Sequence, residues 1–337
     1  MSLRIAINGF GRIGRSFLRA VLLDDQASKQ LDVIAINIGP SAPDMVAHLF
    51  KYDSIMRTFP GSIEFRDGAL FINGKSIKIL TEKDPKSLPW KDLAIDWVVE
   101  ASGHFTTRET ASLHHDAGCK KVVITAPATD EDITIIPGVN DEQYSADQHH
   151  IVSMGSCTTN CFAPLVKVIH QEFCIVSGLM TTTHAYTNDQ VLLDVEHHDP
   201  RRARAAAINI IPTKTGADKV ITKIYPELTG KLKARAIRVP VPTVSLVDFT
   251  FLTEKQISIE LINAAFLRAS RKELLSVVEF VSEPLVSSDF IGNSHSCIFD
   301  SLLTQTIGPM GKVFAWYDNE FGYSSKLKDF LMQKVAR

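Results

Sequence analysis

A run of closely spaced glycines near the start of the chain constrains the fold more than any other feature. Gly9-Phe10-Gly11-Arg12-Ile13-Gly14 follows a β-branched segment, Arg4 to Asn8, and precedes a stretch with apolar residues at helical spacing. The first glycine permits a tight turn, the second lets backbone approach a pyrophosphate, and the third lets helix and strand pack closely. Isolated loop glycines would mean little, but this context predicts a strand–turn–helix unit that binds a dinucleotide at the helix N-terminus.

The rest of the first half continues the alternation of strands and helices. Further strands are expected at 33–36, 96–100, 121–125 and 150–153, and the runs at 96–100 and 121–125 are apolar enough to be buried on both faces. An α/β fold with a Rossmann-like, doubly wound parallel sheet fits this pattern.

The pattern of expected strands changes after about residue 156. Longer alternating strands are expected at 177–183, 233–239 and 243–252, which favours an α+β catalytic domain with a mainly antiparallel sheet. We therefore expect a dinucleotide-binding domain over 1–156, a catalytic domain over 157–320, and a C-terminal helix within 321–337 that packs back on the first domain.

Composition excludes several classes of protein. A formal net charge of -2 gives no reason to expect a nucleic-acid surface, and no stretch approaches the ~18 unbroken apolar residues of a membrane span. Five cysteines, an odd number in 337 residues, favour reduced thiols over a disulfide framework. These features predict a cytoplasmic protein.

The choice between NAD and NADP stays open in the sequence. The second strand of a dinucleotide fold usually ends on an acid that holds the ribose 2′-hydroxyl, but here that place is taken by Ile38. An NADP site would need a cation nearby, and no Lys or Arg occurs between Asn37 and Phe50.

A second motif lies where the pattern of expected strands changes: Ser156-Cys157-Thr158-Thr159-Asn160-Cys161. Apolar positions at near-helical spacing follow it, so Cys157 is expected at a helix N-terminus, where the dipole and free N–H groups favour a thiolate. Pro164 should kink or delay that helix. Cys157 and Cys161 could instead be a buried pair, a disulfide or half of a metal site, although no second Cys/His pair stands at structural-zinc spacing.

A nucleophilic cysteine needs a base, and His184, just after the strand expected at 177–183, is the best candidate among eleven histidines. Position alone does not make it catalytic, because most histidines are structural or on the surface. The adjacent histidines at 114–115, 149–150 and 197–198 are expected to be solvated pairs near turns.

The combination of these segments closely resembles the glyceraldehyde-3-phosphate dehydrogenase family. The likeness runs almost end to end and is carried by eight stretches in the family's order: 8–15, 49–54, 156–160, 184–190, 201–205, 212–216, 238–240 and 316–323. It implies that Cys157 attacks an aldehyde, that His184 acts as its base, that hydride leaves for a nicotinamide, and that inorganic phosphate then attacks the thioester.

The resemblance also implies roles for the remaining candidates. The substrate's C3 phosphate would be held by Thr187, Arg202 and Arg238. The attacking phosphate would be held by Ser156, Thr158, Thr215 and Gly216. The cofactor would be bound by Gly9, Gly11, Arg12, Ile13, Gly14, Ile38, Ser102, Thr125 and Asn319. Without the resemblance, Arg201, Arg202 and Arg204 would be interpreted as a solvated basic turn.

The resemblance further implies a homotetramer, with the loop from Ala185 to about Ala207 packed between subunits. It favours NAD, because a carboxylate at Glu196 would disfavour a nearby 2′-phosphate, and leaves NADP possible. Two other functions stay open at this point: an erythrose-4-phosphate dehydrogenase, whose relatives usually differ in the segment after the histidine, and a non-catalytic dinucleotide-binding protein.

Overall fold

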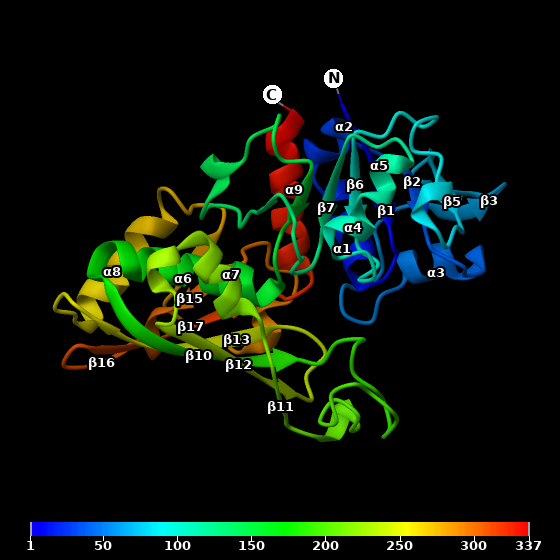
Figure 1. Ribbon diagram of the computed structural model, residues 1–337. Helices are drawn as coiled ribbons and strands as arrows, with labels where there is room; N and C mark the ends of the chain where they lie inside the picture. The colour runs from blue at the N-terminus through cyan, green and yellow to red at the C-terminus, as the bar shows by residue number, and fades with distance from the viewer. Residues whose placement is uncertain (1, 336–337) are drawn as a thin grey trace. The chain divides into compact units, whose positions relative to one another are not determined.

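The computed structural model describes residues 2–335 and divides into two compact units. The first unit comprises the chain up to Ile135, Glu142–Gly155 and the segment from Ser324 onward. The second comprises Ile136–Asp141 and Ser156–Tyr323. Each unit has its own sheet, and each is described by itself below (Figure 1).

The first unit is built on a nine-stranded sheet in the order β3-β4-β5-β2-β1-β6-β7-β9-β8. The strands are β1 (Leu3–Asn8), β2 (Leu31–Asn37), β3 (Ile63–Arg66), β4 (Ala69–Ile72), β5 (Lys75–Leu80), β6 (Trp97–Glu100), β7 (Lys121–Ile124), β8 (Ile133–Thr134) and β9 (Ile151–Ser153). All neighbours pair in parallel except β3–β4 and β4–β5, which form an antiparallel edge. The expected doubly wound parallel sheet is confirmed, with that edge added.

The helices of this unit are α1 (Arg12–Leu22), α2 (Ala27–Gln30), α3 (Val46–Lys51), α4 (Arg108–Ala111), α5 (Leu113–Asp116) and most of α9 (Phe321–Val335). The central strands β1, β6 and β7 are almost fully buried, as continuous apolar runs between helices require. In α9, Phe330 packs edge-on against Trp97 of β6, and Lys328 pairs with Asp24. The end of the chain thus belongs to the core of the first unit.

The second unit has an eight-stranded sheet in the order β11-β12-β10-β13-β17-β15-β14, with β16 paired to β17. The strands are β10 (Ile175–Ala185), β11 (Ile211–Thr213), β12 (Leu232–Val239), β13 (Ser245–Thr253), β14 (Val278–Val281), β15 (Cys297–Asp300), β16 (Gln305–Ile307) and β17 (Met310–Tyr317). Only β10–β12 and β14–β15 pair in parallel, which confirms the mainly antiparallel sheet.

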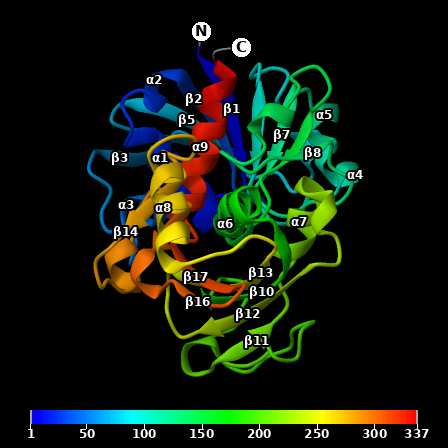
Figure 2. The same ribbon diagram turned by 90° about the vertical axis from the view of Figure 1, so that its left-hand side faces the viewer.

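One face of this sheet is covered by α6 (Cys157–Phe173), α7 (Ala217–Ile224) and α8 (Ile259–Ser270), as both views show (Figures 1 and 2). Short 3-10 turns join elements of both units at Pro43–Met45, Pro85–Ser87, Asp141–Gln143, Ala206–Ile208, Pro226–Leu228, Ser287–Phe290 and Ser301–Leu303.

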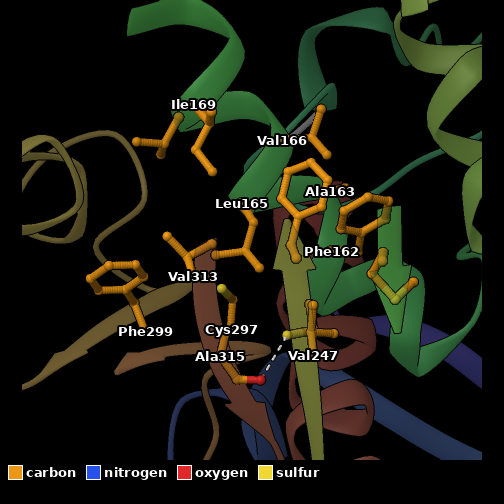
Figure 3. Packing of buried hydrophobic residues seen from close by; sticks show 14 of the residues in the cluster. Phe162, Ala163, Leu165, Val166, Ile169, Val247, Cys297, Phe299, Val313 and Ala315 are labelled. Carbon is orange, nitrogen blue, oxygen red and sulfur yellow. Dashed lines mark hydrogen bonds between the residues drawn. The ribbon is translucent and has the colours of Figure 1, made fainter. Parts of the chain in front are cut away.

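Helix α6 is the centre of the second unit's core. Phe162, Leu165 and Ile169 lie on the side of α6 that faces the sheet and are fully buried against side chains such as Val247 and Val313 (Figure 3). Pro164 lies inside the helix and does not delay its start, so the expected delay was wrong, whereas the expected kink stays a prediction. Its environment explains the tolerance, because burial of the whole apolar face outweighs the one hydrogen bond that proline removes.

Candidate active site

The three fingerprint glycines meet three different environments. Gly9 has φ +94°, and a Cβ there would lie 2.4 Å from the backbone nitrogen of Ser102. A Cβ on Gly14 would lie 2.2 Å from the carbonyl oxygen of Gly9, whereas one on Gly11 would meet nothing within 4 Å. Gly9 and Gly14 are therefore required by turn and packing, and Gly11 faces open space.

That open space belongs to a cavity of about 970 Å³ within the first unit. Its walls come from the carboxyl ends of the strands, where a doubly wound sheet binds its ligands. The lining residues include four predicted cofactor residues, Gly9, Gly11, Ile38 and Ser102. Helix α1 begins at Arg12, and its N-cap Gly11 has no side chain to cap it, so this helix end is of the kind that binds an anion. Size, glycines and helix end together fit a dinucleotide.

The other predicted cofactor residues of the first unit are not among those that line this cavity. Arg12 makes a two-pronged ion pair with Asp53, and Thr125 donates its hydroxyl hydrogen to the carbonyl oxygen of Glu100. Gly14 packs against the carbonyl oxygen of Gly9, and Ile13 is half-buried in α1. Their contacts with the cofactor stay a prediction.

The cavity also contains a cation that the sequence reasoning missed. Lys83 lines it together with Glu82 and Asp84, from the segment that follows β5. Lys83 lies far beyond Phe50 in the sequence, but parallel pairing of β2 with β5 brings residues 82–84 to the same edge as Ile38. Ile38 thus provides no carboxylate, but the segment after the neighbouring strand β5 brings one positive and two negative side chains to the cavity.

The histidine at 114 corrects another expectation. It was predicted to be solvated, yet its side chain is fully buried. Its ring nitrogens contact Trp90 and Glu100 rather than water. The prediction was wrong because one turn of helix places His114 toward the core while His115 remains half-buried.

In the second unit, the predicted nucleophile and base lie side by side. Cys157 is the first residue of α6, which Ser156 caps by accepting from the Thr159 backbone nitrogen at 3.1 Å. The Sγ atom of Cys157 lies 3.4 Å from Nε2 of His184, a hydrogen-bonding distance for sulfur. All five cysteines are free, and residues 2–335 contain no group of side chains that could hold a metal. Cys157 and Cys161 are therefore not joined by a disulfide.

The arrangement around His184 determines which ring nitrogen carries the hydrogen. Its Nδ1 lies 2.6 Å from the carbonyl oxygen of Ala185, which can only accept, so Nδ1 carries the hydrogen and donates it. Arg238 Nη1 approaches Nδ1 at 3.0 Å and donates to the same carbonyl at 2.9 Å. The Nε2 lone pair is then directed at the Cys157 thiol, as a general base requires.

Burial and charge set the protonation of this pair. Burial, with a smaller contribution from the Arg238 charge, lowers the pKa of His184 to about 3. Burial raises the pKa of the Cys157 thiol, although the Arg238 guanidinium opposes the rise. At neutral pH both groups are therefore neutral when no ligand is bound.

Arg238 reaches this place through strand register. In the parallel pair β10–β12, His184 lies opposite Arg238. The Arg238 guanidinium also lies 3.4 Å from Oγ1 of Thr187, another predicted phosphate residue. Its Nε is buried without a hydrogen bond in the part of the chain that the structure describes. A buried guanidinium with a spare donor is suited to an anion.

Arg202 is more fully engaged than Arg238. It pairs with Asp189, and its Nε donates to Thr213 at 2.9 Å. Its side chain is 17% exposed, whereas that of Arg204 is 63% exposed. The solvated-turn interpretation therefore describes Arg204 but does not describe Arg202.

The remaining predicted residues of the second unit also have defined places. Thr158 is buried and its hydroxyl lies 3.0 Å from the Tyr317 hydroxyl, which also contacts Thr182 at 2.8 Å. Thr215 and Gly216 precede α7, with Gly216 at its N-cap. Asn319 is buried and accepts from Ser245, which in turn accepts from the backbone nitrogen of Ala185. Asn319 is thus linked to the strand end that carries His184.

Comparison with known proteins covers the same two regions. Residues 3–108 match the family model described as glyceraldehyde 3-phosphate dehydrogenase, NAD binding domain, and residues 156–319 match the model described as glyceraldehyde 3-phosphate dehydrogenase, C-terminal domain.

No helix within residues 2–335 has the length and apolar character needed to span a membrane.

Curated relatives match over nearly their whole length. The chain is 48% identical to glyceraldehyde-3-phosphate dehydrogenase 2 of Bacillus subtilis (strain 168), covering 100% of this chain and 98% of the relative. It is 48% identical to glyceraldehyde-3-phosphate dehydrogenase of Geobacillus stearothermophilus, covering 98% and 97%. It is 49% identical to the Mycobacterium avium enzyme of the same name, covering 98% of each.

Proposed function

We propose, from the premise that this chain belongs to the glyceraldehyde-3-phosphate dehydrogenase family, that it oxidises D-glyceraldehyde 3-phosphate with inorganic phosphate to 1,3-bisphosphoglycerate. NAD is the cofactor, as the NAD-binding family model over residues 3–108 indicates. The observation that carries the proposal is the 3.4 Å contact between Cys157 Sγ and His184 Nε2 in a chain that matches both domains of the family.

The first chemical step uses the neutral thiol–imidazole pair. As Sγ of Cys157 attacks the aldehyde carbon, Nε2 of His184 takes the thiol proton and becomes an imidazolium. The Nδ1–H bond to the Ala185 carbonyl oxygen stabilises that charge, and the imidazolium stabilises the oxygen of the hemithioacetal. A bound nicotinamide would supply the hydride acceptor, so that the hemithioacetal on Cys157 would become a thioester open to attack by phosphate.

Two anion sites are part of the proposal. Thr187, Arg202 and Arg238 would hold the substrate phosphate, supported by the buried, incompletely bonded guanidinium of Arg238 beside Thr187. Ser156, Thr158, Thr215 and Gly216 would hold the attacking phosphate, supported by two helix starts: Ser156 caps α6, and Gly216 caps α7. Arg202 would have to loosen its pair with Asp189 to take part.

The proposed cofactor site is completed by Arg12, Ile13, Gly14, Thr125 and Asn319. The proposed domains are a dinucleotide-binding domain over residues 1–156 and a catalytic domain over residues 157–320, with a C-terminal helix that returns to the first domain. Asn319 would hold the carboxamide of the nicotinamide. The hydrogen bond from Ser245 supports this role, because it occupies the Asn319 Oδ1 atom and leaves the amide hydrogens to donate.

The choice of NAD over NADP rests on charge. Lys83 offers a cation to a 2′-phosphate, but Glu82 and Asp84 in the same cavity offset it, and Ile38 contributes no hydrogen bond. We expect NADP to be used more weakly than NAD. Catalytic efficiencies for the two cofactors, measured at one pH, test this, and a large advantage for NADP would contradict it.

A homotetramer is proposed for the assembly. The segment that follows His184 carries three exposed apolar side chains, Leu192, Val195 and Leu193, the first of them 86% exposed. A cluster of this kind on a loop is a surface that another subunit covers. Light scattering after size exclusion tests the number of subunits, and a monomer at working concentration would contradict the proposal. A cytoplasmic location stays a prediction, and the five free thiols agree with it.

One assay tests the reaction itself. The purified protein is given glyceraldehyde 3-phosphate or erythrose 4-phosphate, each with and without inorganic phosphate, and reduction of NAD is followed. We expect phosphate-dependent turnover of the three-carbon sugar. Phosphate-independent acid formation from the four-carbon sugar would support the erythrose-4-phosphate reaction instead, and no turnover of either would leave a non-catalytic dinucleotide-binding protein.

A further inference from the structure

A buried carboxylate lies under the dinucleotide cavity and takes no part in the chemistry described above. Glu100, the last residue of β6, is 1% exposed. Its two oxygens contact four hydrogen-bonding groups: Asn8 Nδ2, Ser102 N, Ser102 Oγ and His114 Nε2. A buried carboxylate of this kind is costly unless hydrogen-bond donors surround it, so the arrangement of these four donors matters for the fold around it.

The direction of the hydrogen bond from His114 is fixed by Trp90. The indole Nε1–H can only donate, and it lies 3.1 Å from Nδ1 of His114. Nδ1 therefore carries a lone pair, and the ring hydrogen is on Nε2, 3.0 Å from Glu100 Oε2. His114 is a neutral donor rather than a cation, which leaves Glu100 without a cationic partner among these four groups.

The direction of the bond from Asn8 is fixed from the opposite side. The backbone of Glu82 donates to Asn37 Oδ1 at 2.9 Å and accepts from Asn37 Nδ2 at 2.9 Å. Asn37 Nδ2 also donates to Asn8 Oδ1 at 2.7 Å, so Asn8 must donate its own amide hydrogen to Glu100. Two chains of hydrogen bonds, one from Glu82 through Asn37 and Asn8 and one from Trp90 through His114, end as donors on one carboxylate.

The groups that Glu100 fixes are those that shape the cavity. Asn8, Asn37 and Ser102 all line it. The Ser102 backbone nitrogen, held at 2.8 Å from Glu100, is also the atom that a Cβ on Gly9 would strike. The Ser102 hydroxyl in turn accepts from the His104 backbone nitrogen at 3.1 Å. Glu100 therefore holds the turn after β6 against the first fingerprint glycine.

We propose that Glu100 is a positioning residue for the dinucleotide: its ionised carboxylate, the common acceptor of the Trp90–His114 and Asn37–Asn8 chains, holds Ser102 and Asn8 in the geometry that binds NAD. This inference deepens the proposed function and rests on it. It assigns a role to the pair Glu100–His114, which is far from the thiol chemistry along the chain and belongs to the other compact unit.

The test is the dissociation constant of NAD, measured by calorimetry on the full-length protein, beside kcat at saturating NAD. Glu100→Gln keeps the shape but turns one acceptor into a donor that faces donors. We expect the dissociation constant to rise about ten- to hundredfold, with kcat changed less than about threefold. An unchanged dissociation constant in folded protein would overturn the proposal.

A matched control separates positioning from stability. Asp300 is a buried carboxylate of the second unit that accepts from the indole of Trp316 at 3.1 Å. Asp300→Asn should lower the melting temperature and leave the dissociation constant of NAD unchanged. If Asp300→Asn and Glu100→Gln weaken NAD binding equally, Glu100 is only a structural residue and the proposal fails.

Trp90→Phe keeps the test decisive if Glu100→Gln does not fold, and a double-mutant cycle sharpens the test if Glu100→Gln folds. Trp90→Phe removes the donor that fixes His114, and we expect a rise of about threefold in the dissociation constant of NAD; none would overturn the proposal. A double-mutant cycle of Glu100→Gln with Ser102→Ala should be non-additive in NAD affinity, whereas additivity would contradict a shared mechanism. Wild-type protein that neither binds NAD nor turns over would instead refute the proposed function.

Discussion

Beneath the dinucleotide cavity, Asn8, Asn37 and Glu100 are almost fully buried and are joined by hydrogen bonds, whereas at the thiol site Arg238 Nε is buried without one in residues 2–335. The first arrangement is complete before any ligand binds. The second keeps a donor in reserve, which an anionic substrate can satisfy. A preformed shape suits a cofactor used in every turnover, and spare polar groups suit a substrate whose charge changes during the reaction.

The largest effect should come from the sulfur. Cys157→Ser is expected to lower kcat by at least about 10⁴-fold, because an alcohol beside a neutral imidazole is a far weaker nucleophile than a thiol. The dissociation constant of NAD, to which the thiol itself should contribute little, should change less than about twofold. Stopped-flow assays and calorimetry measure the two quantities, and a large loss of NAD affinity would show that the regions are not independent.

A smaller loss is expected when the base is removed. His184→Asn should lower kcat by about 10² to 10⁴-fold, since the thiol then has no group to take its proton at 3.4 Å. Because burial raises the pKa of Cys157, the residual rate should climb with pH as thiolate forms. A pH–rate profile that stays flat between about pH 7 and pH 9 would contradict this assignment.

Substitutions of the glycines test whether the space beside Gly11 is needed to bind the dinucleotide. Gly11→Ala adds a methyl group where a Cβ meets no protein atom within 4 Å, so stability should fall by no more than about 1 kcal/mol. We expect the dissociation constant of NAD to rise at least about tenfold, because the methyl group occupies the space for the pyrophosphate. Gly9→Ala is the contrasting variant: its clash with Ser102 should destabilise the fold. Normal NAD binding by Gly11→Ala would place the pyrophosphate elsewhere.

The smallest effect concerns Asp53, the partner of Arg12. Burial alone would raise the pKa of this carboxyl, but hydrogen bonds from Arg12 and the backbone of Met56 and Ile55 hold it below 3.8. Its stabilisation is thus fully present above the unfolded value of about 3.9 and is lost as pH falls through the lower folded value.

Asp53→Asn should therefore cost about 1 kcal/mol at neutral pH, a modest amount because the pair is partly exposed, and progressively less below about pH 4. Urea midpoints of both proteins across this range measure the difference. A gap that widens with acid would reverse the sign of the argument.

Local sequence patterns predicted the parts of the fold that depend on local chemistry. The strand–glycine–helix unit was predictable because each glycine answers a separate steric need, and the buried strands β6 and β7 were predictable as apolar runs. His184 was already the best candidate base for Cys157 because it follows a strand end, but only the family resemblance implied that the two side chains meet, since no periodicity brings residues that far apart together.

What escaped prediction depends on non-local packing. The burial of His114 is decided by Trp90 and Glu100, which lie elsewhere along the chain, and adjacent histidines gave no sign of it. Lys83 was missed because its approach to Ile38 follows from the pairing of β2 with β5. The tolerance of α6 for Pro164 depends on burial of the surrounding helix.

The parallel ladder of β10 and β12 has a consequence for how this chain can change in length. His184 and Arg238 lie directly opposite each other on the two strands. Their separation is therefore set by the fixed distance between hydrogen-bonded strands and not by the length of the connecting chain. Insertions between Ala185 and Leu232 that leave both strands intact should preserve that spacing. Deletion of a single residue inside either strand would turn one of the two side chains to the opposite face of the sheet and abolish the contact.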